Sequence, residues 1–226
     1  MSEQWRLFLA ALRFVTRMPV SSPDAGGPHF PIQALRFVPL VAIVVGAIGA
    51  GVYWLAAQLW PTSVAVVLAM AATAGLDARH RNLGVLYWVF ALLLKYNALM
   101  ALSSANLPLQ LPANLTLGLI MIAAQAASGA LLASVVAGDA SHRRSDVHPR
   151  AAAGDLGVAL LIGLAPAAVL GIPGLIGVAC AIVVRMALAK TSSPAVGRGN
   201  PGRLEVTCRA TEICFYLGAL ATWKYV

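Results

Sequence analysis

The chain has 226 residues, of which 60% are hydrophobic and only 11% are charged, and its formal net charge is +8. Soluble domains carry about 25% charged residues, so this composition excludes an ordinary water-soluble domain and predicts an integral membrane protein. The three cysteines, Cys180, Cys208 and Cys214, have no metal-type spacing and form no even disulfide set.

The first predicted element is an amphipathic helix over residues 3–18, which ends before Pro19. At 100° per residue, Arg6, Arg13 and Arg17 fall within a sector of about 40°. A stripe of three cations suits a helix that lies on the membrane surface rather than one that crosses it. The alternative is an amphipathic core helix of a soluble domain, which the composition of the whole chain disfavours.

Seven apolar segments of roughly membrane-spanning length follow. The uncharged run 156–184 is too long for one helix, and Gly-Ile-Pro-Gly at 171–174 predicts a break within it. The predicted fold is therefore an all-α, polytopic membrane helix bundle, a single domain over 1–226 with an N-terminal interfacial helix. The seven predicted transmembrane helices cover about 37–57, 62–76, 83–102, 115–138, 156–171, 174–190 and 210–224.

The basic residues alternate between the connecting segments. Fourteen of the sixteen Lys and Arg residues lie before the first span, in 77–82, 139–155 and 190–209, or at Arg185. This pattern predicts a bacterial inner membrane protein whose N-terminus and basic loops are cytoplasmic. The positive charge is thus a topology signal and not a sign of nucleic-acid binding, and it also favours contact with anionic lipid or a phosphorylated substrate.

The acidic residues are expected on the same cytoplasmic side as the basic loops. They are Glu3, Asp24, Asp77, Asp139, Asp146, Asp155, Glu205 and Glu212. Segment 139–155, "DASHRRSDVHPRAAAGD", combines carboxylates with Arg143, Arg144 and Arg150, the groups that hold divalent cations and phosphate oxygens. A metal and phosphate site and a solvated charged loop are both compatible with this pattern. The same two readings apply to "DARHRN" at 77–82, where the second is a cytoplasmic anchor.

Lys95 lies in the middle of the third predicted span. A charge at that depth is costly, so such residues are usually functional or paired with another group. The alternative is that the side chain extends toward the periplasmic surface.

Several segments together resemble the cobalamin synthases, the adenosylcobinamide-GDP ribazoletransferases. "LRFVTRMPV" resembles the family's L-x-F-[LI]-T-R-[LM]-P-V, and "ALRFVPLVAIVVGAIGAGVYWL" resembles its first span. "DARHRNLGVLYWVFALLLKYNAL" resembles D-S-R-x-G-x-x-G followed by an apolar run and a lysine, which places Asp77, Arg79 and Lys95 at family positions. "HPRAAAGDLGVAL" matches R-x-x-G-L-G through Arg150, and Glu212 fits the glutamate of the C-terminal segment.

Three departures from the family pattern stand beside these matches. The family's acidic signature, H-x-D-G-L-A-D-x-x-D-G, is absent, because "AATAGLDAR" passes directly to Asp77. Gly129 stands where the family often has an arginine. The Thr-Gly-Asp of the family's C-terminal motif is missing, although Leu204 fits that motif.

The resemblance implies a transferase in the last steps of cobalamin biosynthesis, with a corrinoid nucleotide and a ribazole as small-molecule substrates. It implies Asp77, Arg79 and Lys95 as catalytic residues, and Mg²⁺ as the cofactor. With the acidic signature gone, Asp77, Asp139 and Asp146 are the predicted Mg²⁺ ligands. Other cobalamin-assembly enzymes are expected as partners.

Three hypotheses follow from these observations. The first is a working, shortened ribazoletransferase with a rebuilt Mg²⁺ site. The second is a catalytically inactive relative that binds an intermediate or acts as a membrane scaffold, as the missing acidic signature suggests. The third is a small transporter, suggested by Lys95 but opposed by the absence of an inverted repeat in the sequence.

Overall fold

The structure is a computed structural model that describes residues 3–16, 31–76, 85–104, 112–143, 149–191 and 201–222. Every element in these ranges is helical, which confirms the predicted all-α membrane bundle. The elements are α1 (Glu3–Val15), η1 (Ile32–Phe37), α2 (Val38–Ala56), α3 (Thr62–Leu76), α4 (Val85–Ser103), α5 (Ala113–Arg143), α6 (Pro149–Val169), α7 (Ile172–Thr191) and α8 (Pro201–Thr222).

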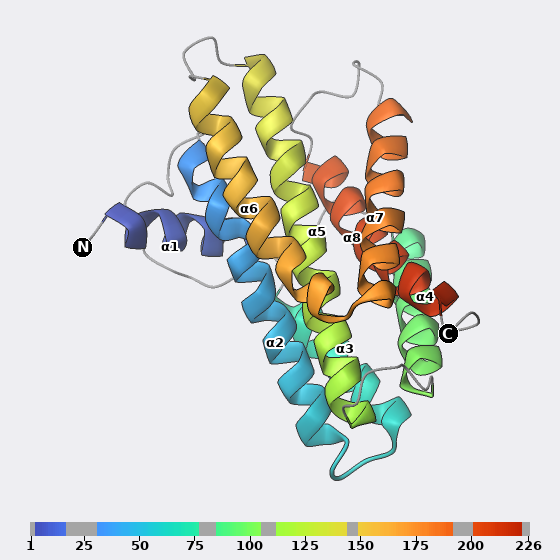
Figure 1. Ribbon diagram of the computed structural model, residues 1–226. Helices are drawn as coiled ribbons and strands as arrows, with labels where there is room; N and C mark the ends of the chain where they lie inside the picture. The colour runs from blue at the N-terminus through green and yellow to red at the C-terminus, as the bar shows by residue number, and fades with distance from the viewer. Residues whose placement is uncertain are drawn as a thin grey trace.

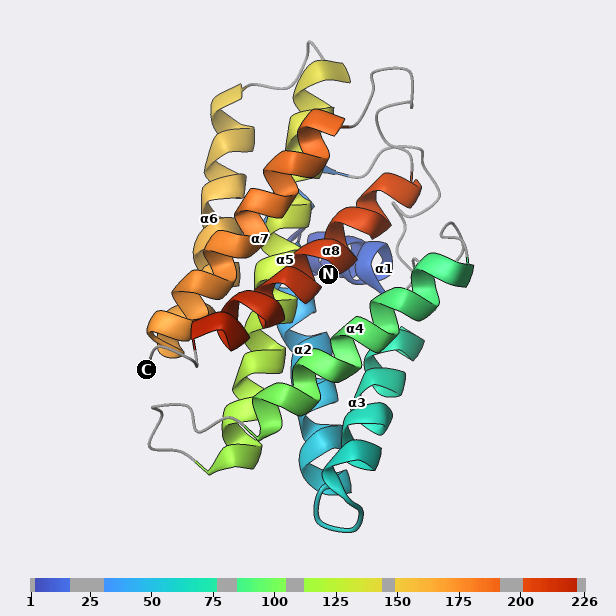
Figure 2. The same ribbon diagram turned by 90° about the vertical axis from the view of Figure 1, so that its right-hand side faces the viewer.

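Helix α1 lies across the long axes of α2, α5 and α6, and it is seen nearly end-on in the second view (Figures 1 and 2). Its buried side chains Leu7 and Ala11 share a core cluster with residues of η1, α2, α5 and α6. Arg36 of η1 donates a hydrogen bond to Gln4 at 2.5 Å and lies 3.9 Å from Asp155 of α6. One guanidinium therefore joins α1 to the bundle.

Helices α2 and α5 pack closely against each other at positions where one helix carries a glycine. A Cβ atom at Gly129 would lie 2.6 Å from the Cβ of Ala42, and one at Gly46 would lie 2.9 Å from the Cα of Ile122. Real Cβ atoms essentially never approach other atoms below 3.0 Å. The space at residue 129 therefore cannot hold the arginine that the resembling family often carries there.

The long uncharged run of the sequence forms two helices. α6 ends at Val169 and α7 begins at Ile172, with Gly171 between them at a φ of 65°. A positive φ of this size is adopted readily by glycine but costs other residues energy, so Gly171 allows the chain to turn between the two helices.

Four of the described helical stretches are long and apolar enough to cross a membrane. They are Gln33–Ala56, Val85–Ser103, Asn114–Gly138 and Ile172–Lys190, whereas α3 and Ala153–Val169 are shorter apolar helices. The count of seven spans stays a prediction.

Two segments that the sequence suggested were loops are largely helical. α5 continues to Arg143 and α6 begins at Pro149, so much of 139–155 belongs to helices. α8 begins at Pro201, whereas the sequence predicted a loop over 190–209. Charged residues lower the hydropathy of these helix ends, and hydropathy was the signal that set the predicted boundaries. At the N-terminus, α1 ends at Val15 rather than at residue 18.

Candidate functional site

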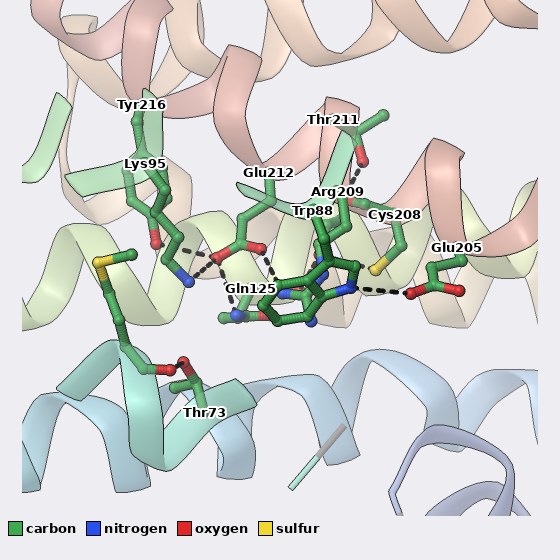
Figure 3. Close-up of polar contacts among 12 residues, drawn as sticks. Thr73, Trp88, Lys95, Gln125, Glu205, Cys208, Arg209, Thr211, Glu212 and Tyr216 are labelled. Atoms are coloured by element: carbon green, nitrogen blue, oxygen red, sulfur yellow. Dashed lines mark hydrogen bonds and ion pairs between the residues drawn. The ribbon is translucent and has the colours of Figure 1, made fainter. Parts of the chain in front are cut away.

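One face of α8 carries charged and polar side chains into the interior of the bundle (Figure 3). Glu205, Arg209, Glu212 and Tyr216 are spaced by three or four residues, so they lie on one side of the helix. The two carboxylates are each 1% exposed. Buried charges of this kind require partners, because an unpaired charge in an apolar interior is strongly disfavoured.

Glu212 is the centre of the cluster. Its Oε1 atom lies 2.5 Å from Nζ of Lys95, accepts a hydrogen bond from Nε2 of Gln125 at 2.9 Å, and accepts one from the hydroxyl of Tyr216 at 3.3 Å. Its Oε2 atom lies 3.4 Å from Nη1 of Arg209. Both oxygens of this carboxylate contact protein groups, and the carboxylate joins α4, α5 and α8 at one point.

Lys95 is paired, as one of the two sequence-based readings proposed. Its side chain is 5% exposed and its ammonium group contacts Glu212 inside the bundle. The alternative, in which the side chain extends to the periplasmic surface, is wrong. Lys95 also lies 5.9 Å from the ring centroid of Tyr216, so both the carboxylate and an aromatic ring face its charge.

Glu205 is a second buried carboxylate with a different environment. Its Oε1 atom accepts a hydrogen bond from the indole Nε1 of Trp88 at 3.4 Å. Its Oε2 atom is buried and finds no hydrogen-bond partner among the described residues. The guanidinium of Arg209 lies 5.4 Å from the ring centroid of Trp88, so the two carboxylates are linked through an arginine and a tryptophan.

Two small cavities border this cluster. One, of about 10 Å³, lies between α4 and α8 beside Lys95 and Glu212. The other, of about 20 Å³, lies where α1, α2, α3, α5 and α8 meet. Each has room for about one water molecule or one hydroxyl group. The second cavity is lined by Val15, Val38, Ala42, Val45, Thr73, Gln125, Ser128, Gly129, Leu132 and Cys208.

The described residues do not fit the expected Mg²⁺. No group of three His, Cys, Asp or Glu side chains within the described ranges comes close enough to hold a metal ion. Of the two carboxylates in the cluster, Glu212 is already surrounded by cations and donors. Mg²⁺ usually takes oxygen ligands from carboxylates and water in octahedral geometry, which this arrangement does not offer.

Most of the predicted site residues have no described side chain. Asp77, Arg79, Arg144 and Asp146 lie outside the described residues. Asp139 and Arg143 belong to the last turns of α5, and Arg150 to the first turn of α6, with backbones but not side chains described. Lys95 is thus the one predicted site residue that the structure places in a described cluster.

Sequence reasoning did not identify Glu205, Trp88 or Gln125 as site residues. It placed Glu205 in the charged segment 190–209 and Glu212 near the start of the last predicted span. A signal was present in the spacing of 205, 209 and 212, which puts three charges on one helical face. A second signal was Lys95 itself, because a buried lysine requires a counter-ion.

The known proteins that the chain resembles are adenosylcobinamide-GDP ribazoletransferases. Residues 7–81 match the family model described as cobalamin-5-phosphate synthase. An adenosylcobinamide-GDP ribazoletransferase of Leptothrix cholodnii is 46% identical over 80 residues, which is 35% of this chain and 30% of that protein. Its counterpart from Shewanella denitrificans is 42% identical over 69 residues, or 30% of this chain and 26% of that protein.

A longer match is found with the adenosylcobinamide-GDP ribazoletransferase of Ralstonia nicotianae. It is 31% identical over 163 residues, with 58% of this chain and 60% of that protein covered. Because 58% of 226 residues is fewer than 163, that alignment contains gaps in this chain. The chain therefore spans less than two thirds of the length of each of these relatives. No solved structure matches the chain.

Proposed function

We propose that this chain, a member of the cobalamin synthase family, is a membrane transferase that joins adenosylcobinamide-GDP to α-ribazole or its 5′-phosphate. The observation that carries the proposal is the match of residues 7–81 to the family, together with the activity named for the relatives. In this reaction the ribazole 5′ oxygen forms a bond to phosphorus. The bond from that phosphorus to GMP breaks, so the products are adenosylcobalamin, or its 5′-phosphate, and GMP.

The arrangement of the bundle supports this proposal in one respect. The polar cavity of Thr73, Gln125, Ser128 and Cys208 lies against α1, α2 and α3, the helices of the matched segment. α8 and α5, which lie outside that segment, supply its other walls. The proposed position of the ribazole is at this junction of matched and unmatched segments, with most of the molecule outside the cavity, which has room for about one hydroxyl group.

The proposed phosphate-binding residues are Arg143, Arg144 and Arg150. Arg143 and Arg150 stand at the adjoining ends of α5 and α6 (Figure 1). Positive charges there would attract the negatively charged oxygens of a diphosphate and partly neutralise them. Asp77, Arg79 and Lys95 remain the proposed catalytic residues, and the ammonium group of Lys95 also holds α4 against Glu212.

We retain Mg²⁺ as a proposed cofactor, with Asp77, Asp139 and Asp146 as its proposed ligands. Because the described carboxylates do not offer a metal site, no step of the reaction is assigned to the ion. The proposed setting is the bacterial inner membrane, with the N-terminus and the basic segments cytoplasmic, and with other cobalamin-assembly enzymes as partners.

A second candidate function is a catalytically inactive relative that binds an intermediate. The observation that favours it is the absence of the family's acidic signature from the sequence. Such a protein would bind a corrinoid or a ribazole without turnover.

Complementation distinguishes the two candidates. The chain is expressed in a bacterium that lacks its own cobalamin synthase, with cobinamide and dimethylbenzimidazole supplied, and cobalamin-dependent growth is scored. Growth that is lost in Asp77→Ala but kept in Glu3→Gln supports the transferase. No growth, with the protein shown to be in the membrane, contradicts catalysis and favours the binding protein.

A further inference from the structure

Arg185 is the only charged residue between Ile172 and Lys190, the part of α7 that is apolar enough to cross a membrane. A charge within a spanning helix is costly unless it is paired or reaches the membrane interface. Arg185 precedes Lys190 by five residues, or about 7.5 Å along a helix. It therefore lies near the end of the span, on the side of the bundle where α5 ends and α6 begins (Figure 1).

Two hydrogen bonds to α5 fix the guanidinium of Arg185. Its Nε atom donates to the hydroxyl of Ser134 at 3.1 Å, and its Nη2 atom donates to the backbone carbonyl oxygen of the same residue at 3.4 Å. The hydroxyl of Ser134 donates in turn to the carbonyl oxygen of Leu131 at 2.6 Å, so it presents a lone pair to Arg185. A neutral serine thus orients this cation without neutralising it.

The guanidinium of Arg185 has further donors. An arginine carries five N–H groups, and the bonds to Ser134 use two of them. Among the side chains that the structure describes, no carboxylate forms an ion pair with Arg185. Three N–H groups and the positive charge are therefore left for a ligand, and the planar fork of an arginine matches two oxygens of a phosphate.

A row of apolar side chains continues from Arg185 along α7. Ile182, Val178 and Leu175 precede it by three, seven and ten residues, the spacing that aligns side chains along a helix. Ile182 is 37% exposed and Leu175 is 60% exposed, and Val178 is half-buried between them. The row is about 15 Å long, which is half of a hydrocarbon core of about 30 Å. An acyl chain of one leaflet covers that depth.

We propose that Arg185 and the row of Ile182, Val178 and Leu175 bind an anionic phospholipid. Its phosphate accepts hydrogen bonds from the remaining N–H groups, and one acyl chain lies along the row. A free phosphate would leave the row uncovered. A zwitterionic lipid would bring a cation close to Arg185, where none of the described carboxylates is placed to receive it. The inference goes beyond the proposed function and does not depend on catalysis.

The first measurement is the headgroup preference of the unaltered protein. The full-length chain in detergent micelles is titrated with a phosphatidylglycerol and with a phosphatidylcholine that carry the same acyl chains, and native mass spectrometry gives both dissociation constants. The phosphatidylglycerol should bind about tenfold more tightly, the lower end of the range for a hydrogen bond to a charged group. Equal affinities would overturn the inference without the use of any variant.

Two variants then test the site itself. Arg185→Gln should remove the preference for phosphatidylglycerol. Ser134→Ala keeps every charge and removes only the hydroxyl that orients the guanidinium, so it should lower the preference several-fold. Lys190→Gln is the matched control, because it removes a positive charge from an exposed residue at the same end of α7, and it should lower the preference less than Arg185→Gln. Thermal unfolding checks that each variant is folded, and Ser134→Ala decides if Arg185→Gln is not.

Two results would contradict a defined lipid site. Equal losses in Arg185→Gln and Lys190→Gln, with Ser134→Ala unchanged, would mean a general attraction to the positive end of the bundle. The second comparison uses glycerophosphoglycerol, the same headgroup without acyl chains, which should bind at least tenfold more weakly because it leaves the apolar row uncovered. Binding as tight as that of the lipid would identify the occupant as a soluble phosphate. Complementation tests the proposed function separately from all of these measurements.

Discussion

The contact between Lys95 and Glu212 makes a quantitative prediction about stability. Removing one partner of a buried ion pair costs about 3–5 kcal/mol, because the other charge is left uncompensated. Glu212→Gln removes the carboxylate that Lys95 contacts inside the bundle and that lies 3.4 Å from Arg209, so it should destabilise by about that amount. Lys95→Met should cost less, because Arg209, 3.4 Å from Glu212, remains as a counter-ion. The double variant should be more stable than the sum of the two changes by about 1–3 kcal/mol.

The assay is equilibrium unfolding in mixed micelles, followed by tryptophan fluorescence for the wild type, both single variants and the double variant. Asp155→Asn is the control, since its pair with Arg36 is longer, at 3.9 Å, and partly exposed. Breaking that pair should cost less than about 1 kcal/mol. Additivity of Lys95→Met and Glu212→Gln within about 0.5 kcal/mol would refute the assignment of a coupled buried pair.

Three further predictions follow from the packing and the site. Gly129→Leu should destabilise the protein in thermal unfolding by about 3 kcal/mol or more, because the new Cβ would clash with Ala42. Gly138→Ala on the same helix is the control and should be neutral or stabilising, because nothing lies within 4 Å of a Cβ there. Gly171→Ala should lower stability by about 1 kcal/mol, since alanine disfavours a positive φ, and an unchanged melting temperature would contradict the role of this residue. Mg²⁺ affinity measured by calorimetry should fall in Asp77→Asn and stay unchanged in Glu205→Gln, and the reverse pattern would place the ion at the buried cluster.

The fold class was predictable because it depends on composition. Long apolar runs separated by charged segments have few folded solutions other than a helical membrane bundle. The beginning of α8 was not predictable from hydropathy, because Arg203, Glu205 and Arg209 make its first turns resemble a loop. Two of those charges, Glu205 and Arg209, are compatible with a helix because they are buried in the bundle, where Arg209 pairs with Glu212, and such pairing is a property of the tertiary structure.

The candidate site was predictable only in part. Lys95 could be recognised from its depth in an apolar run, but its partner Glu212 lies 117 residues away. Only the packing of α4 on α8 brings the two together. The cavity of about 20 Å³ was equally hard to predict, because its walls come from five helices and no local motif contains them.

The separation of Lys95 and Glu212 also has a consequence for biogenesis. At about 5–20 residues per second, α4 is synthesised several seconds or more before the acid that neutralises its lysine. During that interval Lys95 needs another counter-ion, water or the membrane surface. α4 is therefore expected to reach its final position late, after the C-terminal helix has been made, whereas α2 and α5, which pack through glycines and apolar side chains, can associate earlier.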